Sequence, residues 1–161
     1  MSRRLTLRPR DAHTLLLSGL DSFLSALLHE VPEAAATHPA SDARLYPSPT
    51  LGQDPGADEE WGQFVRPGLE EYFAGKRSIM EADLASVRAC ADGSLEVDIP
   101  VAHVHSWIHS LNQARLSLAA QFDISAEEMD SGQAGEGEKG LILFRIQFYG
   151  ILQEWLLEAE A

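Results

Sequence analysis

The sequence predicts a mainly α-helical domain, a helical bundle of four or five helices with a minor two-stranded β element. Long segments carry apolar residues at helical spacing, and only two short ones alternate apolar with polar residues as a half-buried strand does. The expected helical segments are 11–30, 67–91, 99–123 and 141–158. The length of 161 residues suits one core, so we expect a single helical domain over residues 1–161.

The first expected strand is residues 4–8, where charged and apolar residues alternate. Pro9 and Asp11 then favour the start of a helix. Leucine and phenylalanine recur at helical spacing from Asp11 to Glu30, which predicts a helix over this segment.

Residues 31–58 differ in composition from the segments on either side. They hold five of the eight prolines and few apolar residues, which predicts a long Pro-rich loop. Arg44 and Tyr46 belong to the loop's one apolar patch, and we expect them to dock the loop onto the body.

Two helices and a strand are expected before residue 100. Asp58 suits the start of a short acidic helix over 57–64 because negative charge is favourable at a helix N-terminus. Pro67 is placed to open the helix that runs to Ala91. Residues 94–99 alternate again, and we expect this second strand to pair with the first because a lone strand leaves its backbone groups without partners.

The C-terminal part is expected to contain the two most apolar helices. Pro100 opens the helix that ends near Asp123, and a Gly-rich acidic loop follows at 130–140. The last helix, 141–158, is apolar on nearly every side. Such a helix is central to the bundle or is covered by another chain, so a homo-oligomer through 141–158 is possible.

Charge and composition limit the classes of partner that this protein can bind. The formal net charge is −13, and only residues 1–10 are basic, with four arginines and no acid. A body this acidic repels nucleic acid and anionic lipid, so we expect no nucleic acid and no membrane among the partners. Neither a secretory signal nor an apolar run long enough to span a bilayer is visible, which favours a cytoplasmic location. Cys90, the only cysteine, cannot form an intramolecular disulfide.

Asn112 and Arg115 interrupt the apolar stripe of the 99–123 helix. A buried guanidinium needs an acceptor, because an unpaired buried charge costs several kcal/mol. We expect Arg115 to join helices through a carboxylate such as Asp83, Glu81 or Glu154, and Asn112 to tie down a loop. Arg145, in the last helix, is expected to pair with an acid of the 67–91 helix. The alternative for this polar core is the anchor of a small ligand.

His105 and His109 lie four residues apart and share a helix face. The two could reach one metal ion, but carboxylates from other helices would be needed to complete the site. We expect them instead to flank a packed face, and the sequence predicts no metal, no cofactor and no catalytic residue. The glycines at 135, 137 and 140 match a dinucleotide-binding pattern by accident, because no strand precedes them.

Several short motifs suggest a family. Residues 107–118 (WIHSLNQARLSL) resemble the W-L-x-x-L-N-x-x-R-L-x-L core of an uncharacterised bacterial family, domain of unknown function two thousand and seventeen. Residues 44–47 (RLYP) and 152–156 (LQEWL) are similar to its R-L-x-P loop and its terminal L-Q-E-x-L. The resemblance implies a small cytosolic helical protein, often encoded beside the adaptor of the Clp protease, and it supplies no catalytic residue.

These observations favour a non-enzymatic regulatory or protein-interaction domain, with a link to Clp proteolysis implied by gene neighbourhood alone. The alternative is a metal- or small-ligand-dependent enzyme that uses His105, His109 and Arg115. A third hypothesis, a transcriptional regulator, would use the basic residues 1–10.

Overall fold

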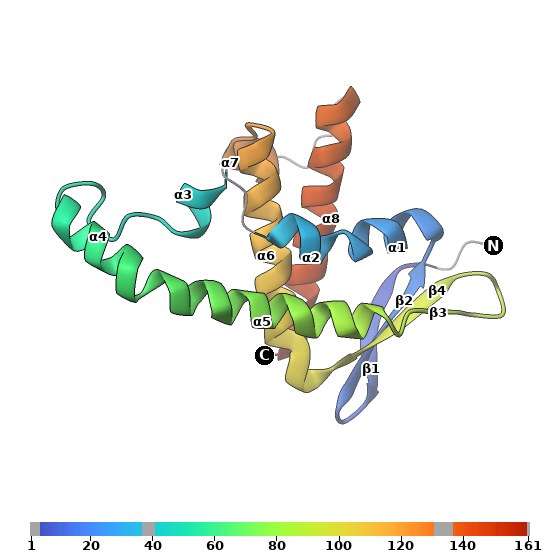
Figure 1. Ribbon diagram of the computed structural model, residues 1–161. Coiled ribbons are helices and arrows are strands. Elements are labelled where there is room, and N and C mark those ends of the chain that lie inside the picture. Colours follow the sequence, from blue (N-terminus) through green and yellow to red (C-terminus); the bar gives the residue numbers. More distant parts are fainter. Residues whose placement is uncertain (1–3, 37–40, 131–136, 161) are drawn as a thin grey trace.

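The leucine-rich residues after Asp11 form one of the two inner strands of an antiparallel sheet in the computed structural model, which describes residues 4–36, 41–130 and 137–160 (Figure 1). The strand order is β1-β2-β4-β3, and every neighbouring pair is antiparallel. The strands are β1 (Thr6–Asp11), β2 (Thr14–Leu20), β3 (Arg88–Ala89) and β4 (Leu95–Pro100).

The helices follow the strands in two groups. Between β2 and β3 lie α1 (Ser22–His29), α2 (Val31–Ala35), α3 (Asp42–Leu45), α4 (Pro55–Phe64) and α5 (Arg66–Leu84). After β4 come the short 3-10 helix η1 (Val101–His103), then α6 (Val104–Gln121), α7 (Ala126–Asp130) and α8 (Gly137–Glu160).

The mainly α class with a minor two-stranded element is therefore wrong, since the chain combines its helices with a four-stranded antiparallel sheet. The error lies in residues 11–20, which were expected to be helical. Their leucines fit a helical period, but an apolar run this short also fits a buried strand. Asp11 stabilises the turn between β1 and β2, because its Oδ1 accepts a hydrogen bond from the backbone N–H of His13 at 2.8 Å. The two expected strands exist, yet they do not pair with each other, because β2 lies between them.

The two faces of the sheet differ in chemistry. Leu15 and Leu17 of β2, with Val97 and Ile99 of β4, belong to the hydrophobic core. On the opposite face Arg88 binds Glu96 at 2.9 Å and Asp98 at 3.0 Å, and Arg10 also binds Asp98. The Arg88 guanidinium, together with Arg10, lowers the pKa of the Asp98 carboxyl below its ordinary value. One face is thus packed and the other carries ion pairs across the strands.

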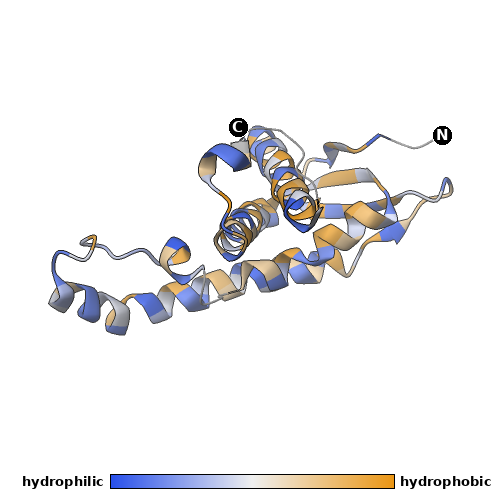
Figure 2. Ribbon diagram, turned by 90° about the horizontal axis from the view of Figure 1, so that it is seen from above, coloured by the Kyte–Doolittle hydropathy of each residue, from blue (hydrophilic) through white to orange (hydrophobic). Residues whose placement is uncertain are grey.

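The core lies between the sheet and the pair α6 and α8. The two helices stand side by side next to the sheet, and α5 crosses them (Figures 1 and 2). Trp107, Leu111, Tyr149 and Leu152 of this pair are buried, each at 2% exposure or less. α4 and the first part of α5 project beyond the body as an arm (Figure 2).

Several expected boundaries move in the structure. The helix expected over 67–91 ends at Leu84, because β3 takes up residues 88–89. The segment 31–58 contains α2, α3 and the start of α4. Within the loop expected over 130–140, residue 130 ends α7 and residues 137–140 begin α8, whereas 131–136 lie outside the described residues. No helix in the described ranges is both long and apolar enough to cross a membrane.

Candidate functional site

A mainly apolar groove of about 790 Å³ runs between β1 and α8. We call it the β1–α8 groove. One wall is residues 4–9 of the N-terminal strand region, and the other is the C-terminal half of α8. Its lining from α8 is Phe148, Ile151, Trp155, Glu158 and Ala159.

The α8 wall follows from helical spacing. Phe148, Ile151 and Trp155 are three and four residues apart, so they share one face of the helix. Phe148 is buried and Trp155 is partly buried against the core, whereas Ile151 is 45% exposed. This face therefore continues the core outward and ends in an uncovered apolar side chain.

The β1 wall follows from strand alternation. Leu5 and Leu7 pack against the core, and Thr6 hydrogen-bonds Ser18 on the polar face of the sheet at 3.1 Å. Side chains of a strand alternate between faces, so Arg4 and Arg8 lie on the polar side with Thr6. The groove thus has an apolar side toward α8 and a basic side at the arginines.

Gly19 allows the start of this wall to lie close to β2. Its φ is +82°, and a Cβ at this position would overlap the backbone carbonyl of Arg4 and lie 2.9 Å from the backbone nitrogen of Leu5. The register between β2 and β4 also shifts between Ser18 and Leu20, as at a β-bulge. Glycine is therefore required here both for its backbone conformation and for the close approach of residues 4–5.

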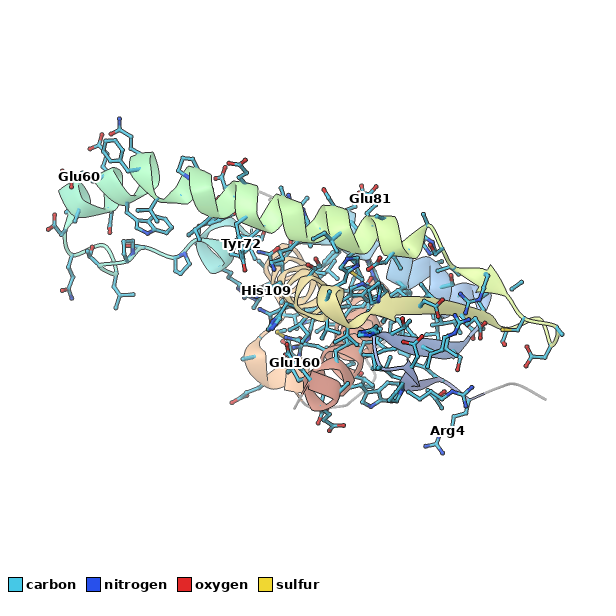
Figure 3. The ribbon with its side chains drawn as sticks, turned by 90° about the horizontal axis from the view of Figure 1, so that it is seen from below. Arg4, Glu60, Tyr72, Glu81, His109 and Glu160 are labelled. Carbon is cyan, nitrogen blue, oxygen red and sulfur yellow. The ribbon has the colours of Figure 1, made fainter. Side chains whose placement is uncertain are left out.

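The arginines of the groove have no acidic partner among the residues that the structure describes. Neither Arg4 nor Arg8 forms an ion pair or a side-chain hydrogen bond with any described residue, in contrast to Arg10. Both are exposed, and Figure 3 shows Arg4 pointing away from the body. Glu158 is the one acid in the lining and comes from the α8 side. The basic charge is therefore confined to the β1 side.

Arg115 does not have the acidic partner that the sequence suggested. It is half-buried, and it donates from Nε to the Ile146 carbonyl and from Nη1 to Gln153 Oε1, both at 3.2 Å. Its guanidinium lies against Gly150 of α8, where a Cβ would be 3.2 Å away. Within the described residues no carboxylate lies within 4.0 Å of it. Arg115 joins α6 to α8 through neutral acceptors.

Asn112 is also half-buried, and no hydrogen bond joins its side chain to another part of the described chain. The fully buried polar side chains of α6 are others, namely Ser106, Ser110, Gln113 and Ser117. The apolar stripe inferred from a fixed 100° step therefore differs from the face that is covered, because α6 is packed by α2, α3, α5 and α8 from several directions.

Arg145 joins α8 to α1 rather than to α5. Its Nη2 lies 3.1 Å from Glu30 Oε2, and its guanidinium donates to the Tyr149 hydroxyl at 3.3 Å. The Tyr149 hydroxyl in turn donates to the Leu27 carbonyl. Burial raises the pKa of the Tyr149 phenol above its ordinary value. This network fixes α8 against the end of α1.

His105 and His109 have separate surroundings. His105 Nε2 lies 2.5 Å from Glu160 Oε1 near the end of α8, whereas His109 contacts the rings of Tyr72 and Phe73 on α5. Among the described residues no group of three metal-ligating side chains occurs. A neighbouring histidine, His103, shares the Asp83 carboxylate with the indole N–H of Trp107, both at 2.9 Å.

His109 is expected to titrate below its ordinary pKa. Burial lowers the pKa of His109 from 6.5, and the nearby charges of Lys76 and His105 lower it further. Because the unfolded chain then binds a proton that the native imidazole does not, this residue reduces stability as the pH falls below about 6.5. An NMR titration checks the value: Lys76→Gln should raise the pKa in part, and Arg8→Gln should not change it. A native pKa at or above 6.5 would contradict the assignment.

Arg44 and Tyr46 differ in their surroundings. Tyr46 is 6% exposed and contacts the ring of Phe73, while the Arg66 guanidinium lies over it at 4.5 Å from the ring centroid. Arg66 also binds Asp42 of α3, and this bond raises the pKa of the guanidinium. Arg44 is exposed. Tyr46 thus holds α3 against α5, and Arg44 takes no part in these contacts.

The β1–α8 groove is the site that sequence reasoning missed. The alternation of residues 4–8 was a usable signal, because it separates two leucines from two arginines. That this strand lies at a sheet edge, and that α8 runs beside it, depends on contacts between the two ends of the chain.

Comparison with known proteins adds a family. A model described as a domain of unknown function (DUF2017) matches residues 3–160. No curated protein and no solved structure matches the chain.

Proposed function

Since the chain belongs to the DUF2017 family, whose function is unknown, we propose from its own geometry that it is a non-enzymatic protein-interaction domain that binds its partner in the β1–α8 groove. The observation that carries this proposal is the groove itself, which has a volume of about 790 Å³ and a mainly apolar lining between a sheet edge and a helix. An uncovered apolar surface of this kind, rimmed by charge, is typical of a protein-binding site.

The alternative enzyme would need His105, His109 and Arg115 to meet at one place. Their contacts argue against it, because His105 lies at Glu160, His109 on the aromatic rings of α5, and Arg115 between α6 and α8. The net charge of −13 argues against nucleic acid as the partner.

The finer parts of the proposal come from the family resemblance and from composition. They are a regulatory role, a cytoplasmic location and a connection to Clp proteolysis. The connection to Clp proteolysis is tested by mixing the purified Clp adaptor with this protein and measuring whether the adaptor binds in the groove. Self-association through α8 would cover Ile151 and Leu157 of this helix, which are about half exposed.

The proposal is tested by placing a photo-crosslinking amino acid at Ile151, in cells that naturally express the chain. The matched control is Leu157, also on α8 and 50% exposed against 45%, but outside the groove. We expect a discrete adduct from position 151 and none from 157, and Leu7→Asp should abolish the adduct. Equal labelling from both positions, or no adduct from 151, would contradict the proposal. An adduct of twice the chain's mass would identify a second copy as the partner.

A further inference from the structure

The outer edge of β1 has no partner strand within the described residues. One edge of β1 pairs with β2 from Thr6↔Ser18 to Asp11↔Thr14, and β1 ends the strand order. The backbone N–H and C=O groups of such an edge are able to pair with a further strand. Pro9 lacks an N–H, so this capacity is confined to the part of the edge before it.

We propose that an extended peptide of another protein adds to β1 as a fifth strand, and that its sequence follows acid–apolar–any–apolar–acid. This inference rests on the proposed function, because it names the partner class of the same groove. Strand addition derives affinity from backbone hydrogen bonds and specificity from alternate side chains.

The apolar positions follow from the α8 side of the groove. A strand added beside β1 directs every second side chain to the face that carries Leu5 and Leu7. On that face the next neighbours are Phe148, Ile151 and Trp155 of α8. Two apolar side chains, two residues apart in the peptide, would cover the exposed surface of Ile151.

The acidic positions follow from Arg4 and Arg8. The two arginines are four residues apart on the other face, exposed and without an acidic partner in the described chain. Side chains directly opposite on adjacent strands interact, and opposite charges there are favourable. The same sheet already uses this chemistry, since Glu96 and Asp98 of β4 bind Arg88 of β3 across the strands. A peptide with acids four residues apart would match Arg4 and Arg8 in either direction.

A second copy of this chain fits the edge poorly. Antiparallel pairing of two β1 strands about Thr6 would place Arg4 of each copy opposite Arg8 of the other, and like charges there are unfavourable. The acidic body, with a net charge of −13, adds long-range repulsion between copies.

The test measures binding of a capped, fluorescent peptide, Ser-Glu-Leu-Thr-Leu-Glu-Ser, to the full chain by anisotropy. Two control peptides replace both Glu by Lys or both Leu by Ala, and a third carries N-methyl groups on the backbone nitrogens of its Leu-Thr-Leu segment. We expect each control to bind at least about tenfold more weakly, and raised salt to weaken only the charged contribution. On the protein, the substitution Arg8→Glu should weaken binding of the acidic peptide and strengthen binding of the Lys peptide. The matched control, Arg44→Glu, makes the same charge change at an exposed site on α3 and should leave the binding of both peptides unchanged.

The outcomes separate this inference from the proposed function. Equal binding of the Glu and Lys peptides, or preference for Lys, would overturn the acidic class. Undiminished binding of the N-methyl peptide would overturn strand addition. If no peptide binds while Ile151 crosslinks a partner, the groove is an interaction site and this inference is wrong. If Ile151 also gives no adduct, both fail. A dimer that Leu7→Asp dissociates would identify a second copy as the occupant and would also overturn the inference.

Discussion

Gly19→Ala is expected to lower the free energy of unfolding by about 3 kcal/mol and to displace the start of β1. A non-glycine residue at the φ of +82° found here costs about 1–2 kcal/mol. The added Cβ also meets the backbone of Arg4 and Leu5, which cannot move aside like the end of a flexible side chain. The β1–α8 groove is lined by these two residues, so the acidic peptide should bind more weakly to this variant as well.

Gly93→Ala is the matched control for this prediction. Gly93 has a φ of +84°, nearly that of Gly19, but an added Cβ there has no heavy atom within 4 Å. Chemical denaturation of both variants therefore separates the backbone cost from the overlap. We expect Gly93→Ala to show the backbone cost alone and to bind the peptide normally. Equal losses in the two variants would contradict the close approach of residues 4–5 to β2.

Trp107→Ala should have the largest effect on stability, a loss of about 3–5 kcal/mol, as for other fully buried aromatic side chains. Trp107 is 0% exposed on α6 and packs where the sheet meets α8, beside Leu17 and Leu152. Its indole N–H donates to Asp83 Oδ2 at 2.9 Å, so truncation also removes a partner of a carboxylate that is only 10% exposed. Thermal or urea unfolding monitored by circular dichroism measures the loss.

Trp155→Ala is the matched control for Trp107→Ala. Trp155 is only partly buried, at the β1–α8 groove, so its truncation removes less buried area and should cost clearly less than that of Trp107. Trp155→Ala should instead weaken peptide binding. A cost for Trp107→Ala no greater than that for Trp155→Ala would contradict the assignment of Trp107 to the centre of the core.

The long helices were predictable because an apolar pattern of their length fits a helix and is too long for a strand. α6 and α8 each carry apolar residues over at least 18 positions, far more than an average strand. β2 was not predictable in this way, since the seven residues from Thr14 to Leu20 satisfy helix and strand alike. Its assignment depends on β1 and β4, which pair with it on both sides and come from distant parts of the sequence.

The partners of the polar residues could not be read from the sequence for a related reason. The sequence shows that Arg115 needs acceptors, and Arg145 likewise, but not which of 25 acids lies nearby. The fold places Arg145 at Glu30 and gives Arg115 only a carbonyl and an amide oxygen. In the sequence, the arginines at 4 and 8 only made the N-terminal residues basic. Their proposed role in binding depends on their position at the edge of the sheet.

Hydrogen exchange of the β1 backbone amides, with and without the acidic peptide, tests most directly whether β1 accepts a further strand. The account predicts slower exchange at alternate amides between Arg4 and Arg8, and no change at β3, the opposite edge of the sheet. Bound peptide with unchanged exchange along β1, or with protection at β3 instead, would contradict it.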